Sequence, residues 1–253
     1  RSQTDSEVVL YALIQWGTKA FDRFNGMFAL AFWDRNESTL LLARDRYGIK
    51  PLYFSTQGQA FLFASEQKAI LANPDFNRKL NKPALLEYFT FQNIFTDQTF
   101  LEDIHLLPAG HYATLNLKKE TPILERTGYW DYRFLEPSEA LKKEEYLEEL
   151  DRLFRQAVNR QLVTDVELGS YLSGGMDSGS ITAIAAESFP YLKTFTCGFD
   201  LSSASGIELA FDERSKAEAM SALFKTEHYE MVLKAGDMER CLPQVARHLE
   251  EPR

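Results

Sequence analysis

One segment constrains the fold of this chain more than any other: residues 168–179, with the sequence Leu-Gly-Ser-Tyr-Leu-Ser-Gly-Gly-Met-Asp-Ser-Gly. It predicts a buried strand that enters a Ser-Gly-Gly-x-Asp-Ser loop, and then a helix that starts at about Ser180. Two adjacent glycines let the backbone approach a ligand and turn its N–H groups toward one point. The hydroxyl groups of Ser173 and Ser178 add donors, and the helix presents its positive end. The pattern therefore indicates an anion-binding loop, and it favours the phosphates of a nucleotide.

Two other kinds of glycine-rich turn have to be weighed against this interpretation. A Walker-type P-loop is excluded because Gly174 is followed by Gly175, and not by the Lys-Ser/Thr pair of that motif. A strand-to-helix turn with a capping aspartate and no ligand is the alternative interpretation.

The segments around the loop alternate between helix and strand patterns. Apolar residues recur at three- and four-residue steps over residues 146–162, which predicts an amphipathic helix. Downstream, the patterns predict helices over 180–187, 212–224 and 235–249, and strands over 193–200 and 227–233. Such alternation predicts a parallel sheet covered on both faces, with ligands at the carboxyl ends of its strands. The anion-binding loop falls at such an end.

Bulk properties limit the class of protein. A chain of 253 residues suits two domains. Its net charge of -9 argues against a general nucleic-acid binder. Cys197 and Cys241 show no disulfide framework and no metal-ligand spacing. No apolar run approaches the ~20 residues of a membrane helix, and no signal-peptide pattern is present. We therefore expect a cytoplasmic protein without a structural metal.

The N-terminal half predicts packed sheets with flanking helices. The run 26–34 is apolar at every inner position, which predicts a strand covered on both faces. Further strands are expected over 39–43, 51–54, 60–64 and 111–117, with a hairpin-like turn at 57–59, and helices over 65–71, capped by Ser65, and 81–89. Arg44 and Asp45 are interpreted as a structural ion pair at a strand end. We expect one domain over 1–132, a linker over 133–142 and a second domain over 143–253.

Several motifs together resemble one enzyme family. The loop at 173–178 resembles the pyrophosphate loop of ATP-pyrophosphatase enzymes. The segments Asp-Ser-Glu at 5–7, Asn-Gly-Met-Phe-Ala at 25–29, Arg-Asp-Arg-Tyr-Gly-Ile-Lys-Pro-Leu-Tyr at 44–53, Ala-Ser-Glu at 64–66 and Leu-Pro-Ala-Gly at 107–110 resemble the glutaminase domain of glutamine-hydrolysing asparagine synthetases. The two motif sets follow the order of that family and cover nearly the whole chain.

The resemblance implies a fold and a two-step chemistry. The fold would be an α+β N-terminal-nucleophile-type sandwich (αββα), followed by an α/β ATP-pyrophosphatase domain of the adenine nucleotide alpha hydrolase-like type, both incomplete. In the family, an N-terminal cysteine hydrolyses glutamine, and the released ammonia attacks an acyl-adenylate made from aspartate and ATP. The implied partners are glutamine, ATP, Mg²⁺ and aspartate, without nucleic acid or membrane, in a homodimer.

Family positions can be transferred to this sequence one at a time. Asp5 matches the aspartate that binds the α-amino group of glutamine, and a helix N-cap is its alternative interpretation. Asp177 is also expected to contact Mg²⁺ through Mg-pyrophosphate. For Cys197, a small buried core position is the alternative interpretation, and both interpretations can hold at once. The implied ATP-binding residues are Leu172, Ser173, Gly174, Gly175, Asp177, Ser178, Cys197 and Gly198.

The match also has departures. The sequence begins at Arg1 and not at the cysteine nucleophile with which the family begins, and both cysteines lie beyond the linker. No catalytic residue is therefore assigned, the chain is expected to be truncated at both ends, and it is expected not to hydrolyse glutamine.

Two alternative functions stay open. The first is the same chemistry on another carboxylate, such as a sugar uronic acid or a β-lactam precursor, because residues 200–211 resemble an inserted loop beside the nucleotide site. The second is a non-catalytic scaffold that kept the fold, and the missing cysteine would support this alternative.

Overall fold

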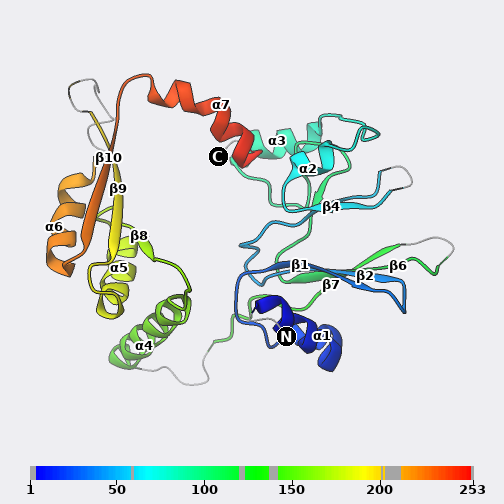
Figure 1. Cartoon of the computed structure of the whole chain (residues 1–253), viewed down its shortest axis with the longest axis horizontal. Helices are drawn as coiled ribbons and strands as arrows, with labels where there is room; N and C mark the ends of the chain where they lie inside the picture. The colour runs from blue at the N-terminus through cyan, green and yellow to red at the C-terminus, as the bar shows by residue number, and fades with distance from the viewer. Residues whose placement is uncertain are drawn as a thin grey trace. The chain divides into compact units, whose positions relative to one another are not determined.

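The computed structural model of the chain describes residues 4–57, 60–119, 123–136, 142–200, 202 and 212–251. They form two compact units (Figure 1). The first unit comprises Arg1–Leu135 together with Ala246–Arg253, and the second comprises Glu136–Val245. The expected hairpin turn at 57–59 and the expected inserted loop at 200–211 lie mostly outside the described residues.

Two antiparallel sheets form the centre of the first unit. One has the order β1-β2-β6-β7, with bounds Ala29–Asp34, Thr39–Arg44, His111–Asn116 and Leu124–Gly128. The other has the order β4-β3-β5, with bounds Leu62–Ala64, Tyr53–Ser55 and His105–Leu106. The helical elements of this unit are α1 (Asp5–Trp16), the 3-10 turn η1 (Gly17–Ala20), α2 (Gln67–Leu71) and α3 (Lys82–Phe91).

Three apolar clusters arrange these elements in layers. Leu41 of β2 packs with residues of α1 and η1, including Leu13 and Ala20. Leu42, the next residue along the strand, points to the opposite face and packs with Leu52 and with Phe54 of the second sheet, whose strand β3 begins directly after Leu52. Beyond that sheet, a third cluster joins it to α2 through Ile70. The order is thus helix, sheet, sheet, helix, as Figure 1 shows for this unit.

Two local expectations for this unit are wrong. The strand predicted over 26–34 begins only at Ala29, and it is an edge strand whose Trp33 is 47% exposed, so it is not covered on both faces. Ser65 does not cap α2, whose N-cap position is Glu66. Instead, the carboxylate of Glu250 accepts the backbone N–H groups of Gln67 at 2.6 Å and Lys68 at 2.7 Å. A residue distant in sequence supplies this cap, so local sequence could not show it.

Asp45 and Arg44 brace the loop that follows β2. The Asp45 carboxylate is 1% exposed and accepts backbone N–H groups at 3.0–3.3 Å; these belong to Phe28, Tyr47, Ile49 and Lys50. The Arg44 guanidinium donates to the carbonyl oxygens of Gly48, Lys50 and Leu107. Both side chains therefore have a structural role, as the sequence indicated. These contacts join them to backbone groups, whereas the sequence predicted an ion pair between the two side chains.

The hydroxyl group of Tyr129 contacts this loop, and its titration links the stability of the loop to pH. The hydroxyl donates to the carbonyl oxygen of Arg44 at 2.8 Å, and burial, followed by the negative charge of Asp45, raises its pKa from 10.0 to about 12. Because the unfolded chain loses this proton at lower pH, the contribution to stability is complete below pH 10 and is lost as pH rises toward 12.

We expect Tyr129→Phe to remove this part of the pH dependence. The measurement is the free energy of unfolding in denaturant at a series of pH values between about 9 and 12 for both proteins. The wild-type curve should fall more steeply than that of the variant. Equal slopes would show that Tyr129 titrates as it does in the unfolded chain.

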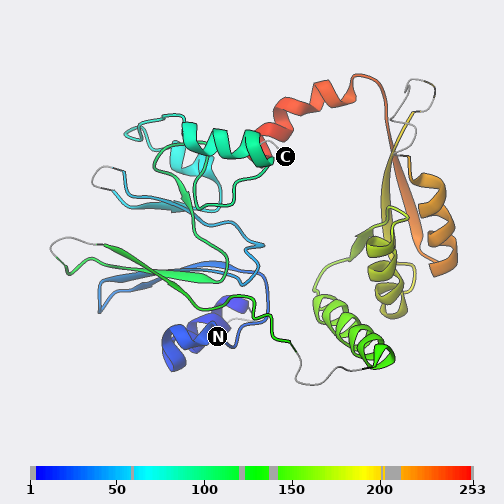
Figure 2. The same cartoon turned by 180° about the vertical axis from the view of Figure 1, so that it is seen from behind.

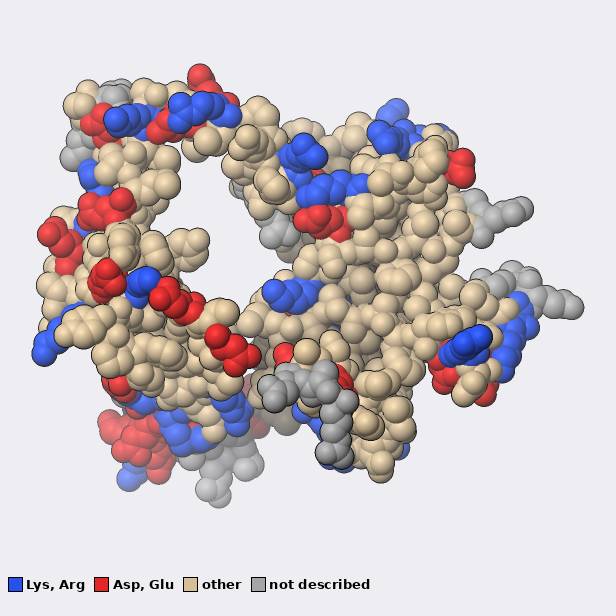
Figure 3. Space-filling model, in the orientation of Figure 1, with Lys and Arg blue, Asp and Glu red and all other residues tan. Residues whose placement is uncertain are grey.

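The second unit contains a parallel sheet with the order β10-β9-β8, with bounds Glu227–Leu233, Lys193–Phe199 and Gly169–Tyr171. Its helices are α4 (Lys143–Gln161), α5 (Met176–Ser188) and α6 (Arg214–Phe224), while α7 (Asp237–Leu249) continues into the first unit (Figure 2). The helix-strand order predicted from the sequence is confirmed, with α4 three residues longer at its start. Acidic and basic side chains lie side by side on the surface of α4 (Figure 3).

Helices cover one face of this sheet. In β9, Thr194, Thr196 and Gly198 are buried, and α6 packs against this strand while α5 packs against β8. On the opposite face Phe195 is 40% exposed and Tyr229 stacks on it at 5.5 Å between ring centroids. Coverage of both faces was predicted, and within the described residues the structure shows it for one face.

Candidate functional site

The Ser-Gly-Gly-x-Asp-Ser loop lies at the carboxyl end of β8, directly before α5. The helix begins at Met176, four residues before the predicted start, so Asp177 and Ser178 belong to its first turn. This shift matters chemically because the first N–H groups of a helix have no partner within the helix. Gly175 is the N-cap residue, and no side chain caps α5 there. The loop and the helix therefore offer backbone donors and a positive dipole at one place.

The two serines close the loop upon itself. The hydroxyl oxygens of Ser173 and Ser178 are 2.9 Å apart, and the Ser178 hydroxyl accepts the Ser173 N–H at 3.1 Å. The Gly175 N–H donates to the Ser173 hydroxyl at 3.3 Å. The sequence suggested that both hydroxyls serve as donors to the anion. Here they hold the glycine backbone in a tight turn, which fixes where its N–H groups point.

Gly174 has a conformation that other residues rarely adopt. Its φ is +76°, in the left-handed region. A Cβ at this position would lie 2.5 Å from the Cβ of Lys216 and 3.1 Å from the backbone nitrogen of Ala217. The first turn of α6 therefore packs directly on the loop. This neighbour lies about forty residues away in the chain, and no local pattern indicates it.

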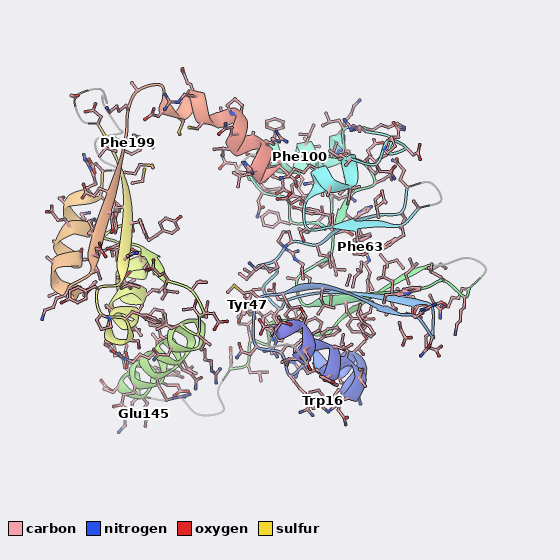
Figure 4. The ribbon with its side chains drawn as sticks, in the orientation of Figure 1. Trp16, Tyr47, Phe63, Phe100, Glu145 and Phe199 are labelled. Carbon is pink, nitrogen blue, oxygen red and sulfur yellow. The ribbon has the colours of Figure 1, made fainter. Side chains whose placement is uncertain are left out.

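The neighbouring strand end brings the other proposed nucleotide residues to the same edge. The Leu172 N–H donates to the Phe195 carbonyl at 2.9 Å, and the Thr196 hydroxyl donates to the Leu172 carbonyl. Leu172 is buried at 1% exposure, and Cys197 is exposed. The interpretation of Cys197 as a buried core residue is therefore wrong. Phe199 marks the carboxyl end of β9 in Figure 4.

A salt bridge orders the start of α6 beside this edge. Arg214 forms a bidentate contact with Asp212, with an Nη2–Oδ2 distance of 2.5 Å, and also donates to the Phe199 carbonyl at 2.9 Å. The guanidinium beside Asp212 lowers the pKa of that carboxyl group, and Asp212 raises the pKa of Arg214. A Cβ on Gly198 would overlap the Nε of Arg214, so a glycine is needed here for the arginine side chain to lie across the strand.

The proposed glutamine-binding residue belongs to the other unit. Asp5 is exposed and is the first residue of α1, whose N-cap position is Thr4, so the N-cap interpretation of Asp5 is wrong. A groove of about 880 Å³ in this unit is lined by residues that include Arg46, Tyr47 and Trp130, and by none of the predicted site residues. Tyr47 is labelled in Figure 4.

Metal clusters and membrane-spanning helices are both absent from the described part of the chain. No cluster of three or more histidine, cysteine, aspartate or glutamate side chains that could hold a metal ion is present in the described ranges. Among the helices described, none is both long enough and apolar enough to cross a membrane.

Comparison with known proteins matches both units to families. Residues 1–130 match the family described as glutamine amidotransferase domain, and residues 149–253 match the family described as asparagine synthase. The asparagine synthetase [glutamine-hydrolyzing] 3 of Bacillus subtilis is 34% identical over 98% of this chain and 40% of its own length. The asparagine synthetase [glutamine-hydrolyzing] 1 of the same organism is 30% identical over 99% of this chain and 38% of its own length. The amidase chyE of Penicillium rubens is 29% identical over 73% of this chain and 27% of its own length. The chain thus spans less than half the length of these relatives.

Proposed function

Because the chain belongs to the glutamine-hydrolysing asparagine synthetase family, we propose that the protein containing it is an ATP-dependent ligase that converts aspartate to asparagine with ammonia from glutamine. The observation that carries this proposal is the loop at residues 173–178. It combines a left-handed glycine, a serine brace and the free N–H groups of a helix start at the carboxyl end of a parallel strand. This arrangement suits the diphosphate of a nucleotide.

The proposed reaction has two steps at this site. The substrate carboxylate attacks the α-phosphorus of ATP, and pyrophosphate leaves while an acyl-adenylate forms. Ammonia then attacks the acyl carbon, and AMP leaves with the electron pair of the broken C–O bond. The backbone N–H groups and the dipole of α5 stabilise the negative charge that develops on pyrophosphate.

Individual residues take the following proposed roles. Gly174, Gly175 and the first turn of α5 bind pyrophosphate, and Ser173 and Ser178 hold the loop. Asp177, which is exposed in that turn, fits a contact with Mg²⁺ bound to the phosphates, since carboxylate oxygens are preferred by that ion. Mg²⁺ would supply positive charge to the leaving group. Leu172, Cys197 and Gly198 line the nucleoside side, and in the glutaminase unit Asp5 binds the α-amino group of glutamine.

The setting of the protein is part of the same proposal. Both cysteines are free thiols, which suits a reducing cytoplasm. We also retain a homodimer, without nucleic acid or membrane as a partner, as expected from the sequence.

The test is exchange of labelled pyrophosphate into ATP, measured with Mg²⁺ and one carboxylic acid at a time. We expect exchange with aspartate, and about a 100-fold loss in Asp177→Ala, whose glutamine hydrolysis should be unchanged in the protein that contains this chain. Exchange with a sugar uronic acid or a β-lactam precursor in place of aspartate would favour the alternative substrate. Absence of both exchange and ATP binding would favour the scaffold.

A further inference from the structure

The start of α6, beside the anion-binding loop, combines acidic and basic residues. The N-terminal end of a helix favours acidic side chains because its dipole is positive there. Asp212 and the N-cap residue Glu213 follow this preference, whereas the first turn of α6 itself contains Arg214 and Lys216 and no acidic residue. Places where a sequence departs from local rules are expected to be functional sites.

The two cations of this turn differ in what they contact. Arg214 is paired with Asp212 and held by the Phe199 carbonyl, so its charge is compensated. Lys216 is exposed, and within the described ranges no ion pair or hydrogen bond of its ammonium group is found. Lys216 therefore stands in the positive field of a helix end, three residues after the N-cap residue Glu213, and its ammonium group has no partner among the described residues.

Lys216 lies directly beside the anion-binding loop. Its Cβ is the atom that a side chain on Gly174 would meet first, at 2.5 Å, so the stem of Lys216 starts against the loop. A lysine ammonium is a compact charge on a flexible four-carbon stem, which suits a phosphate approached from one side. The loop itself offers only neutral donors, while a diphosphate carries several negative charges.

We propose that Lys216 is a pyrophosphate-binding residue, which contacts the β- and γ-phosphates of ATP and the pyrophosphate released from it. The inference rests on the proposed function of the loop. It explains why α6 packs its first turn on Gly174 and why that turn tolerates an unpaired cation. An anion between the N-termini of α5 and α6 and the Lys216 ammonium would complement all three.

The test is calorimetric titration of the protein with Mg-pyrophosphate and, separately, with AMP. Lys216→Met keeps the aliphatic stem and removes the charge, and we expect it to weaken pyrophosphate binding about tenfold or more while AMP binding stays the same. Lys216→Arg should restore most of the affinity. Lys193→Met removes a lysine from the opposite end of β9 and should bind pyrophosphate like the wild type.

Different outcomes would contradict the role of Lys216 and the proposed function of the loop. Wild-type protein that binds neither pyrophosphate nor ATP would overturn the proposed function. Wild-type protein that binds both, with an unchanged affinity in Lys216→Met, would overturn only the role of Lys216. An equal loss for AMP and pyrophosphate would show that Lys216 supports the fold of the loop, and this too would overturn the inference.

Discussion

In the protein that contains this chain, replacing Gly174 with alanine is expected to reduce the proposed ATP-dependent amide synthesis about 100-fold or more, because displacement of catalytic geometry by about 1 Å has effects of that size. The new Cβ would lie 2.5 Å from the Cβ of Lys216 and 3.1 Å from the Ala217 nitrogen, and the residue would keep a φ of +76°. Either α6 or the loop must move, and each movement changes the direction of the N–H groups. Glutamine hydrolysis by that protein, which we propose for the other unit, should not change.

Two further variants identify the cause of this loss. Gly236 has a φ of +85°, and a Cβ added to it would meet no atom within 4 Å, so Gly236→Ala tests backbone strain without a clash. We expect it to retain synthesis. Lys216→Gly removes the nearest clashing atom together with the ammonium group proposed to bind phosphate. Gly174→Ala should therefore cost less ATP affinity when it is added to the Lys216→Gly variant than when it is added to the wild type. Steady-state kinetics and ATP titration provide the comparison; full activity in Gly174→Ala would contradict the loop geometry.

Replacing Asp45 with alanine is expected to destabilise the first unit by about 3 kcal/mol or more, since buried donors that lose their partner each cost ~1–3 kcal/mol. Four backbone N–H groups converge on this carboxylate: those of Phe28 and Lys50 on Oδ2, and those of Tyr47 and Ile49 on Oδ1. A loss of this size should lower the thermal midpoint of the unit by roughly 10 °C, measured by calorimetry.

A matched aspartate provides the control. Asp34 also accepts two backbone N–H groups, from Asn36 at 2.9 Å and Glu37 at 3.0 Å, but at an exposed turn where water can replace it. Asp34→Ala should therefore cost about 1 kcal/mol or less. Asp45→Asn should fall between the two, because one amide oxygen remains an acceptor. Equal effects of Asp34→Ala and Asp45→Ala would refute the bracing role of Asp45.

The sequence predicts most of the second unit because its signals are local. Strand, loop and helix around Gly174 follow from residues adjacent in the chain, and the alternation of periods two and 3.6 defines β9, α6 and β10. The start of α5 is predicted four residues late. Glycine is a poor helix former, and Gly175 directly precedes these four residues while Gly179 is the last of them. The turn is fixed by the contact between Ser173 and Ser178, which a periodicity pattern does not detect.

The first unit shows where local signals fail. The short strands β5 and β7 are not predicted, because two to five residues contain too little periodicity to be recognised. The apolar run before Asp34 predicts burial on both sides, whereas the strand lies at a sheet edge. Burial depends on which strand becomes a neighbour, and pairing between distant segments sets that.

The amino-acid sequence by itself determined the chemistry this chain can offer: a glycine-rich anion loop on a strand-to-helix turn, within a helix-strand alternation that requires a parallel sheet. Tertiary structure alone decided which groups distant in the chain come into contact. It placed Lys216 against Gly174, the carboxylate of Glu250 at the start of α2, and the Phe28 N–H on the Asp45 carboxylate. Backbone preferences act over a few residues, but packing and electrostatics act through space, so partners far apart in the chain become visible only once it is folded.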